Sequence, residues 1–160
     1  MFRGKGDRMT TIYIDADACP VKDEVYKVAR RYAARVLIVA NAAMRVPPDP
    51  LFELVVRTGF GAADDWIAGQ IGPRDVAVTA DVPLAARCVA AGAVVIDPKG
   101  RLLTADSIGE AVAVRDLMEE LRATGEARGG PAAMTAKDRS RFLSRLDEVI
   151  VAARLAAPPG

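Results

Sequence analysis

TIYIDADACP, residues 11–20, decides the fold, because it predicts a buried strand that ends in two carboxylates and leads directly into a helix start. A second stretch of the same design, DVAVTADVP, occupies residues 75–83, and the acidic pair Asp64 and Asp65 precedes it. In a parallel α/β sheet, the carboxyl ends of neighbouring strands open into one crevice. We therefore expect the carboxylates of these separate stretches to converge.

Alternating strand and helix patterns predict the fold class. Runs rich in β-branched residues predict strands at Thr11–Ile14, Val36–Ala40, Leu54–Arg57, Val76–Thr79 and Val94–Ile96. Helical periodicity fills most of the intervals, and this order favours parallel pairing through right-handed crossovers. The last third predicts two helices, which begin at the capping pairs Ser107/Glu110 and Thr135/Asp138, with a glycine-rich break between them at Gly125–Gly130. We expect an α/β fold, a three-layer parallel β-sheet flanked by helices, with both C-terminal helices packed on the sheet.

Length and composition indicate a single domain. The chain has 160 residues, of which 51% are apolar, enough for one core. We expect a disordered extension over residues 1–9, one domain over residues 10–156 and a flexible tail over residues 157–160. No long uncharged apolar run is present, so we expect no membrane partner. The 22 basic and 21 acidic residues nearly balance, and any attraction for nucleic acid would be local.

The absence of histidine narrows the chemistry. With no histidine, the chain has no serine–histidine triad, no Cys–His pair and no His–Zn site. An enzyme built from this sequence would use carboxylates, metal ions, lysine or thiolate. Only two cysteines occur, Cys19 and Cys88, both in apolar surroundings, which favours buried thiols in a reducing cytoplasm. A nucleophilic Cys19 is disfavoured because Val25 stands where a Cys-x5-Arg phosphate loop would place arginine.

The carboxylates are the main candidates for chemistry. Asp15 ends a predicted buried strand, where an unpaired charge is costly to desolvate. The others also have structural interpretations, as helix caps for Asp17 and Asp81 and as partners of a helix dipole for Asp64 and Asp65. Converging carboxylates repel by roughly 4 kcal/mol per pair at about 4 Å and an effective dielectric near 20. A divalent cation relieves this repulsion, and oxygen-only ligands suit Mg²⁺ or Mn²⁺.

Four further residues are candidates for binding phosphate or substrate: Lys22, Asn41, Arg45 and Thr79. Lys22 lies one turn into the first helix, and Arg45 follows the second strand near the same sheet edge as Asp15. Structural alternatives are a surface ion pair for Lys22 and a bond to a backbone carbonyl for Thr79. The basic stripes on the predicted helices are typical of solvated faces. Almost no exposed aromatic residue is predicted, so the stacking half of a single-strand-binding signature is missing.

Several ordered motifs resemble one known family. They are IDADACPVK at residues 14–22, Asn41 with MRVP at 44–47, ADDWIA at 63–68, VTADVPLA at 78–85, RDLM at 115–118, GGP at 129–131 and Asp138-Arg139. Together they closely resemble the YaiI/YqxD family of uncharacterised bacterial proteins, over roughly residues 11–155. That family looks PIN-like, which implies a parallel sheet related to metal-dependent nucleases. The resemblance implies metal-binding roles for Asp15, for Asp65 in Asp65-Trp66-Ile67-Ala68 and for Asp81 in Thr79-Ala80-Asp81.

Three functions follow as expectations. The first is Mg²⁺- or Mn²⁺-dependent phosphodiester hydrolysis, with RNA as the expected substrate. Asp15, Asp65 and Asp81 would be catalytic, helped in metal binding by Asp17 and Asp64. The second is a haloacid-dehalogenase-like phosphatase, in which Asp15-Ala16-Asp17, Thr79 and Lys99 would act. The third is a non-catalytic module that binds RNA or protein through arginine-rich helices. The oligomeric state stays open, with a homodimer as one option.

Overall fold

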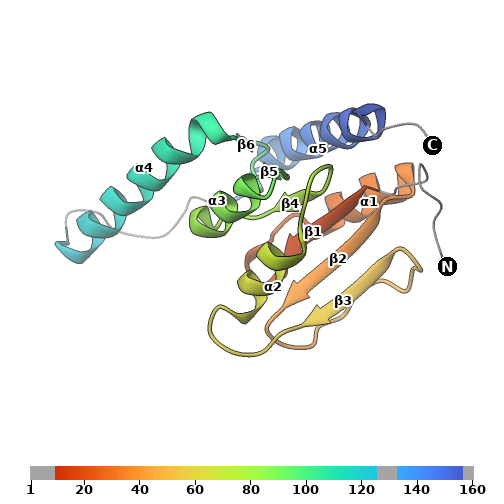
Figure 1. Ribbon diagram of the computed structural model, residues 1–160, viewed down its shortest axis with the longest axis horizontal. Coiled ribbons are helices and arrows are strands. Elements are labelled where there is room, and N and C mark those ends of the chain that lie inside the picture. Colours follow the sequence, from red (N-terminus) through yellow and green to blue (C-terminus); the bar gives the residue numbers. More distant parts are fainter. Residues whose placement is uncertain (1–9, 126–132, 157–160) are drawn as a thin grey trace.

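Strand β1 (Thr11–Asp15) lies in the middle of the sheet in the computed structural model, which describes residues 10–125 and 133–156 (Figure 1). Within these residues the sheet has six strands in the order β3-β2-β1-β4-β5-β6. The other strands are β2 (Arg35–Ala40), β3 (Phe52–Val56), β4 (Val76–Val78), β5 (Val94–Ile96) and β6 (Leu102–Leu103). All neighbouring pairs are parallel except β5 and β6, which are antiparallel. The predicted α/β class is therefore confirmed, and the predicted parallel pairing holds for every pair except β5 and β6.

Helices cover both faces of the sheet. They are α1 (Lys22–Tyr32), α2 (Ala62–Gln70), α3 (Val82–Ala90), α4 (Ala105–Ala123) and α5 (Ala136–Ala156), and a short 3₁₀ turn, η1, spans Ala16–Ala18. Alternate residues of β1 point to opposite faces. Ile12 and Ile14 pack with α1 and α5, whereas Tyr13 packs with α2 and α3. The result is three layers with a separate apolar core on each face.

The strand order creates a switch point beside β1. From β1 the chain continues through α1 to β2 and β3 on one side of the sheet. It then crosses through α2 to β4, which pairs with the opposite side of β1. At such a point, the loops that leave the two central strands diverge and leave a crevice at their carboxyl ends, where α/β proteins bind ligands. This crevice lies between the ends of β1 and β4.

The two C-terminal helices differ from each other. Helix α5 packs on the sheet as predicted, because Phe142, Leu146 and Ile150 are fully buried in the core that it shares with α1. Helix α4 has no buried residue and leaves the body of the molecule (Figure 1). Its first turns pack beside α3, and Leu117, further along, is 53% exposed. The prediction that both helices pack on the sheet is therefore wrong for most of α4, whose apolar positions are spread around the helix rather than confined to one stripe.

Smaller differences concern element boundaries. The capping box of α4 is formed by Thr104 and Ser107, not by Ser107 and Glu110, because the helix begins one turn earlier than predicted. The pair Thr135 and Asp138 caps α5 as predicted. Strand β3 begins at Phe52 rather than Leu54, and the two-residue β6 was not predicted. The extension at residues 1–9, the tail at 157–160 and most of the glycine-rich break lie outside the described residues.

Candidate functional site

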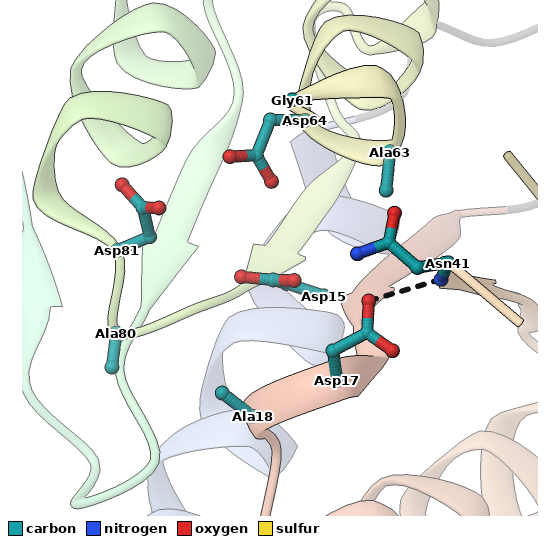
Figure 2. A pocket seen from close by; sticks show the side chains of 9 residues that line it. All are labelled: Asp15, Asp17, Ala18, Asn41, Gly61, Ala63, Asp64, Ala80 and Asp81. Atoms are coloured by element: carbon teal, nitrogen blue, oxygen red, sulfur yellow. Dashed lines mark hydrogen bonds between the residues drawn. The ribbon is translucent and has the colours of Figure 1, made fainter. Parts of the chain in front are cut away.

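An acidic cleft of about 380 Å³ opens at the switch point. Its walls come from the ends of β1 and β4, from η1, from the loop after β2 and from the first turn of α2. The cleft is lined by Asp15, Asp17, Ala18, Asn41, Gly61, Ala63, Asp64, Ala80 and Asp81. Figure 2 shows the carboxylates of Asp15, Asp64 and Asp81 turned toward a common space. Four of the five predicted acidic residues therefore line one cleft, although they are far apart in the sequence.

A buried threonine connects the two central strand ends. Thr79 Oγ1 donates a hydrogen bond of 2.9 Å to Asp15 Oδ2 and accepts one of 3.0 Å from the backbone N–H of Asp81. Thr79 is only 3% exposed, so its hydroxyl is occupied by these two partners. The predicted role of Thr79 as a direct phosphate ligand does not fit this geometry. Thr79 instead holds Asp15 and Asp81 in place.

Asp81 has two roles in this arrangement. It is the N-cap of α3, and its Oδ1 accepts a hydrogen bond of 3.1 Å from the backbone N–H of Leu84. Its carboxylate also lines the cleft. Asp81 can therefore cap α3 and contribute to the site at the same time, because a cap needs only one of the two carboxylate oxygens.

Asp17 joins the ends of β1 and β2. Asp17 Oδ2 accepts a hydrogen bond of 3.0 Å from the backbone N–H of Asn41, which places the Asn41 amide beside the cleft (Figure 2). Asp17 does not cap the following helix, because the N-cap of α1 is Val21. The helix-cap interpretation of Asp17 is therefore wrong.

The two members of the acidic pair point in different directions. Asp64 lines the cleft, whereas Asp65 forms an ion pair of 2.8 Å with Arg87 and has a side chain that is 71% exposed. The expectation that Asp65 shares an ion with Asp15 and Asp81 is therefore wrong in this structure. The spacing of apolar residues in α2 could have indicated this orientation. Ala63 and Ile67, four residues apart, are the buried positions of the helix. Asp65 is two residues from each, which puts it on the opposite side of the helix.

The electrostatics reflect crowding of negative charge. Burial raises the pKa of Asp15, and the carboxylates of Asp81 and Asp17 raise it further, while the Thr79 hydrogen bond and Lys22 act in the opposite direction. Burial also raises the pKa of Asp64 to about 6, with Asp15 and Asp81 as the next causes. Burial and neighbouring carboxylates therefore destabilise the charged forms of Asp15 and Asp64, and a bound cation would relieve this destabilisation.

The donor set is suited to a hard cation, but it is not a closed cage. Among residues 10–125 and 133–156, no three histidine, cysteine or acidic side chains lie close enough together to hold a metal ion on their own. Mg²⁺ usually takes one or two carboxylates directly and keeps several water molecules. Oxygen-only donors arranged around an open cleft, with the pKa values of Asp15 and Asp64 raised, fit such a partly hydrated ion. They do not fit a dehydrated ion held by protein ligands alone.

The predicted phosphate ligands are placed unequally. Asn41 lines the cleft. Lys22 donates from Nζ to the carbonyl oxygen of Cys19 at 2.9 Å, and its charge lowers the pKa of Asp15. Arg45 is exposed in the loop between β2 and β3 and is not among the residues that line the cleft. Cys19 is buried, and desolvation raises the pKa of its thiol, which confirms the structural interpretation of this cysteine.

The fold and the cleft define a class of protein: an open, mostly parallel α/β sheet with an acidic crevice at its switch point. The chain belongs to the family described as "Uncharacterized BCR, YaiI/YqxD family", whose model matches residues 13–152. The predicted family is therefore confirmed. Among the described residues, every helix is too short or too polar to cross a bilayer.

Relatives match nearly the whole chain. A UPF0178 protein of Rhodopseudomonas palustris (strain ATCC BAA-98 / CGA009) is 57% identical over 155 residues, which cover 95% of this chain and 98% of the relative. A UPF0178 protein of Bradyrhizobium sp. (strain ORS 278) is 55% identical over 141 residues, covering 88% of this chain and 86% of the relative. A UPF0178 protein of Gluconacetobacter diazotrophicus is 52% identical over 147 residues, which cover 91% of this chain and 96% of the relative. The comparison with solved structures finds no match.

Proposed function

We propose that this protein is a Mg²⁺- or Mn²⁺-dependent nuclease that hydrolyses phosphodiesters, with RNA as its substrate. The observation that carries the proposal is the convergence of Asp15, Asp64 and Asp81 at the switch point of the sheet. Acidic clefts of this type hold divalent cations that bind phosphate, and such chemistry needs no histidine. The parallel sheet with an acidic cleft at the ends of β1 and β4 is also consistent with a PIN-like fold, which we include in the proposal.

Each of the five polar residues that line the cleft has a defined part in this proposal. Asp15 and Asp81 would hold the ion, because Thr79 fixes the position of both. Asp64 and Asp17 would bind its water molecules from the two other walls, and the Asn41 amide would orient a phosphate oxygen. When bound, the ion would supply charge stabilisation and an activated water. Asp65 has no part in the cleft, and its proposed catalytic role passes to Asp64.

The phosphatase alternative is less well supported. A haloacid-dehalogenase-like mechanism would need Lys99 beside Asp15, but Lys99 is not among the residues that line the cleft. Instead, the charge of Lys99 contributes to lowering the pKa of Asp138, which caps the start of α5. This location separates the proposed lysine from the proposed nucleophile.

The binding-module alternative also loses support. It relies on arginines that are free to contact a partner, yet several arginines of the two basic helices form ion pairs within the chain. These pairs are Arg31 with Asp147, Arg139 with Glu24 at 3.6 Å, Arg141 with Asp138 at 3.5 Å and Arg145 with Glu148 at 3.7 Å. The solvated-face interpretation therefore explains most of these charges.

The two free thiols, Cys19 and Cys88, are consistent with a reducing compartment. We therefore include a cytoplasmic location in the proposal.

The test combines cleavage with metal binding. Asp15→Asn and Asp81→Asn keep the side-chain shape but remove the charge, and Asp65→Asn is the matched control outside the cleft. Single-stranded RNA and DNA are incubated with Mn²⁺, with Mg²⁺ and with a chelator, while Mn²⁺ binding is followed separately by electron paramagnetic resonance. We expect both cleavage and Mn²⁺ binding to be lost in the first two variants and retained in the control. Cleavage that persists in the chelator, or in both cleft variants, contradicts the proposal.

A further inference from the structure

Phe60 is the most exposed large apolar residue in the described part of the chain. Its relative exposure is 108%, so no other part of residues 10–125 and 133–156 packs over the ring. Isolated apolar residues on a surface are common, so the exposure of Phe60 bears on function only through its position in the chain. The sequence predicted almost no exposed aromatic residue beside the basic ones, and Phe60 is the aromatic residue that the structure adds to the candidates for stacking.

The position of Phe60 links it to the acidic cleft. The next residue, Gly61, lines the cleft and is the N-cap of α2, the helix that carries Asp64. Gly59 and Gly61 have φ angles of +112° and +72°, in the region that side chains rarely adopt. The two glycines therefore shape the turn that carries the exposed Phe60, whose chain neighbour Gly61 belongs to the cleft wall.

A cation accompanies this aromatic ring on the same segment. The Arg57 guanidinium lies 5.2 Å from the centre of the Trp66 ring and donates a hydrogen bond of 2.8 Å to the Val56 carbonyl oxygen. Among the ion pairs of the described residues, none involves Arg57. The segment between β3 and α2 thus combines an exposed ring with a cation that has no carboxylate partner. Proteins that bind single strands combine the same two elements, stacking and backbone contact.

We propose that Phe60 stacks on an unpaired nucleobase next to the phosphate bound in the cleft, which makes the substrate a single-stranded nucleic acid. This inference rests on the proposed nuclease function and adds the substrate class. Stacking requires a base whose face is free, and a base inside a duplex is already stacked on both sides. Every base has an aromatic face, so we expect little sequence preference. Arg57 contacts the backbone beside the stacked base.

The experiment compares ligands with and without bases. Fluorescence anisotropy measures the Kd of a labelled single-stranded RNA, of the same strand with abasic riboses and of the corresponding duplex. Ca²⁺ replaces Mg²⁺ so that binding is measured without turnover. The variants are Phe60→Ala, Phe60→Leu, which keeps an apolar side chain without a ring, and Phe60→Trp, which keeps a ring. Because the side chain is wholly exposed, these variants should fold like the parent.

The expected result is specific to bases. Phe60→Ala and Phe60→Leu should weaken binding of the single strand roughly 5- to 150-fold, whereas Phe60→Trp should not. Binding of the abasic strand should be equal in all variants. In a Trp66→Phe background, which removes the only native tryptophan, the fluorescence of Phe60→Trp should be quenched by the single strand and unchanged by the abasic strand.

Three contrary results can be told apart. If the parent binds single-stranded RNA and Phe60→Ala binds it equally well, stacking is wrong and the proposed nuclease stands. If the parent binds neither strand and cleaves neither RNA nor DNA, the proposed function fails and the inference fails with it. Equal losses for the abasic and the base-containing strands would also overturn stacking, since the effect would then not depend on bases.

Discussion

Thr79 joins Asp15 to Asp81 through one hydroxyl group, by donating to Asp15 Oδ2 at 2.9 Å and accepting from the Asp81 N–H at 3.0 Å. Asp15 ends β1, Asp81 follows the neighbouring strand β4 as the N-cap of α3, and the two residues are 66 positions apart in the chain. Because the hydroxyl is buried, a change of this one side chain alters both walls of the cleft at once. Thr79 is thus a positioning residue for the two carboxylates that the proposal assigns to the metal.

Replacing Thr79 separates this positioning role from a packing role. Thr79→Val keeps the shape but removes the donor and the acceptor, so we expect a loss of about 1–3 kcal/mol in the free energy of unfolding. The pKa of Asp15 should rise further, because the Thr79 hydrogen bond lowers it. The acid limb of the cleavage pH profile should therefore move to higher pH. Thr79→Ser, which keeps the hydroxyl, is the control and should retain the parent profile. An unchanged profile in Thr79→Val would contradict the positioning role.

The acidic pair on α2 offers a matched comparison of neighbouring residues. Asp64→Asn should weaken Mn²⁺ binding and reduce metal-dependent cleavage, because Asp64 lines the cleft. Asp65→Asn should leave both nearly unchanged, since it removes only a surface ion pair with Arg87, worth about 0–1 kcal/mol of stability. Calorimetric titration of Mn²⁺ and a cleavage assay measure the two effects. A larger loss in Asp65→Asn than in Asp64→Asn would return the catalytic role to Asp65.

The raised pKa of Asp64 predicts a pH dependence of stability. The pKa is about 6 in the folded protein against an ordinary value of 3.8, so the folded state holds this proton more tightly than the unfolded state does. Between about pH 4 and pH 6, the contribution of this group to the free energy of unfolding therefore falls as the pH rises, and it stays low above pH 6. Thermal unfolding from pH 4 to pH 7.5 should show this fall in the parent and a smaller one in Asp64→Asn.

The same charge crowding predicts how a cation changes stability. A bound cation offsets the repulsion between ionised carboxylates, so Mn²⁺ should raise the Tm at pH 7.5. At pH 5 the rise should be smaller, because protons compete with the metal for the carboxylates. Na⁺ at matched ionic strength controls for general screening. An equal rise in Tm with Mn²⁺ at both pH values would show that these carboxylates are not the binding groups.

The contrast between α5 and α4 predicts unequal costs of truncation. Phe142→Ala empties a fully buried position in the core and should cost about 3–5 kcal/mol of the free energy of unfolding. Leu117→Ala removes a half-exposed side chain from α4 and should change it by less than about 0.5 kcal/mol. Chemical denaturation at two protein concentrations measures both effects. A large, concentration-dependent loss in Leu117→Ala would show that the face of α4 around Leu117 is buried in an assembly.

The sequence by itself determined the order of strands and helices and the residues that carry chemistry. Mostly apolar runs such as Thr11–Asp15 and Val76–Val78 predict the buried central strands. A strand that is covered on both faces of a parallel sheet needs continuous apolar character. The same pattern places Asp15 at the end of one strand and Asp81 shortly after another, and the absence of histidine leaves oxygen ligands as the main choice.

Only the tertiary structure decided which carboxylates meet and which surface remains open. Asp64 and Asp65 are chemically identical neighbours, and the packing of Ala63 and Ile67 against the sheet turns one into the cleft and the other toward Arg87. Thr79 became a link between strands because β4 pairs with β1, a contact that local sequence does not encode. Phe60 is exposed for the same reason, since its type predicts burial and only the path of the chain at Gly59 and Gly61 leaves it in solvent.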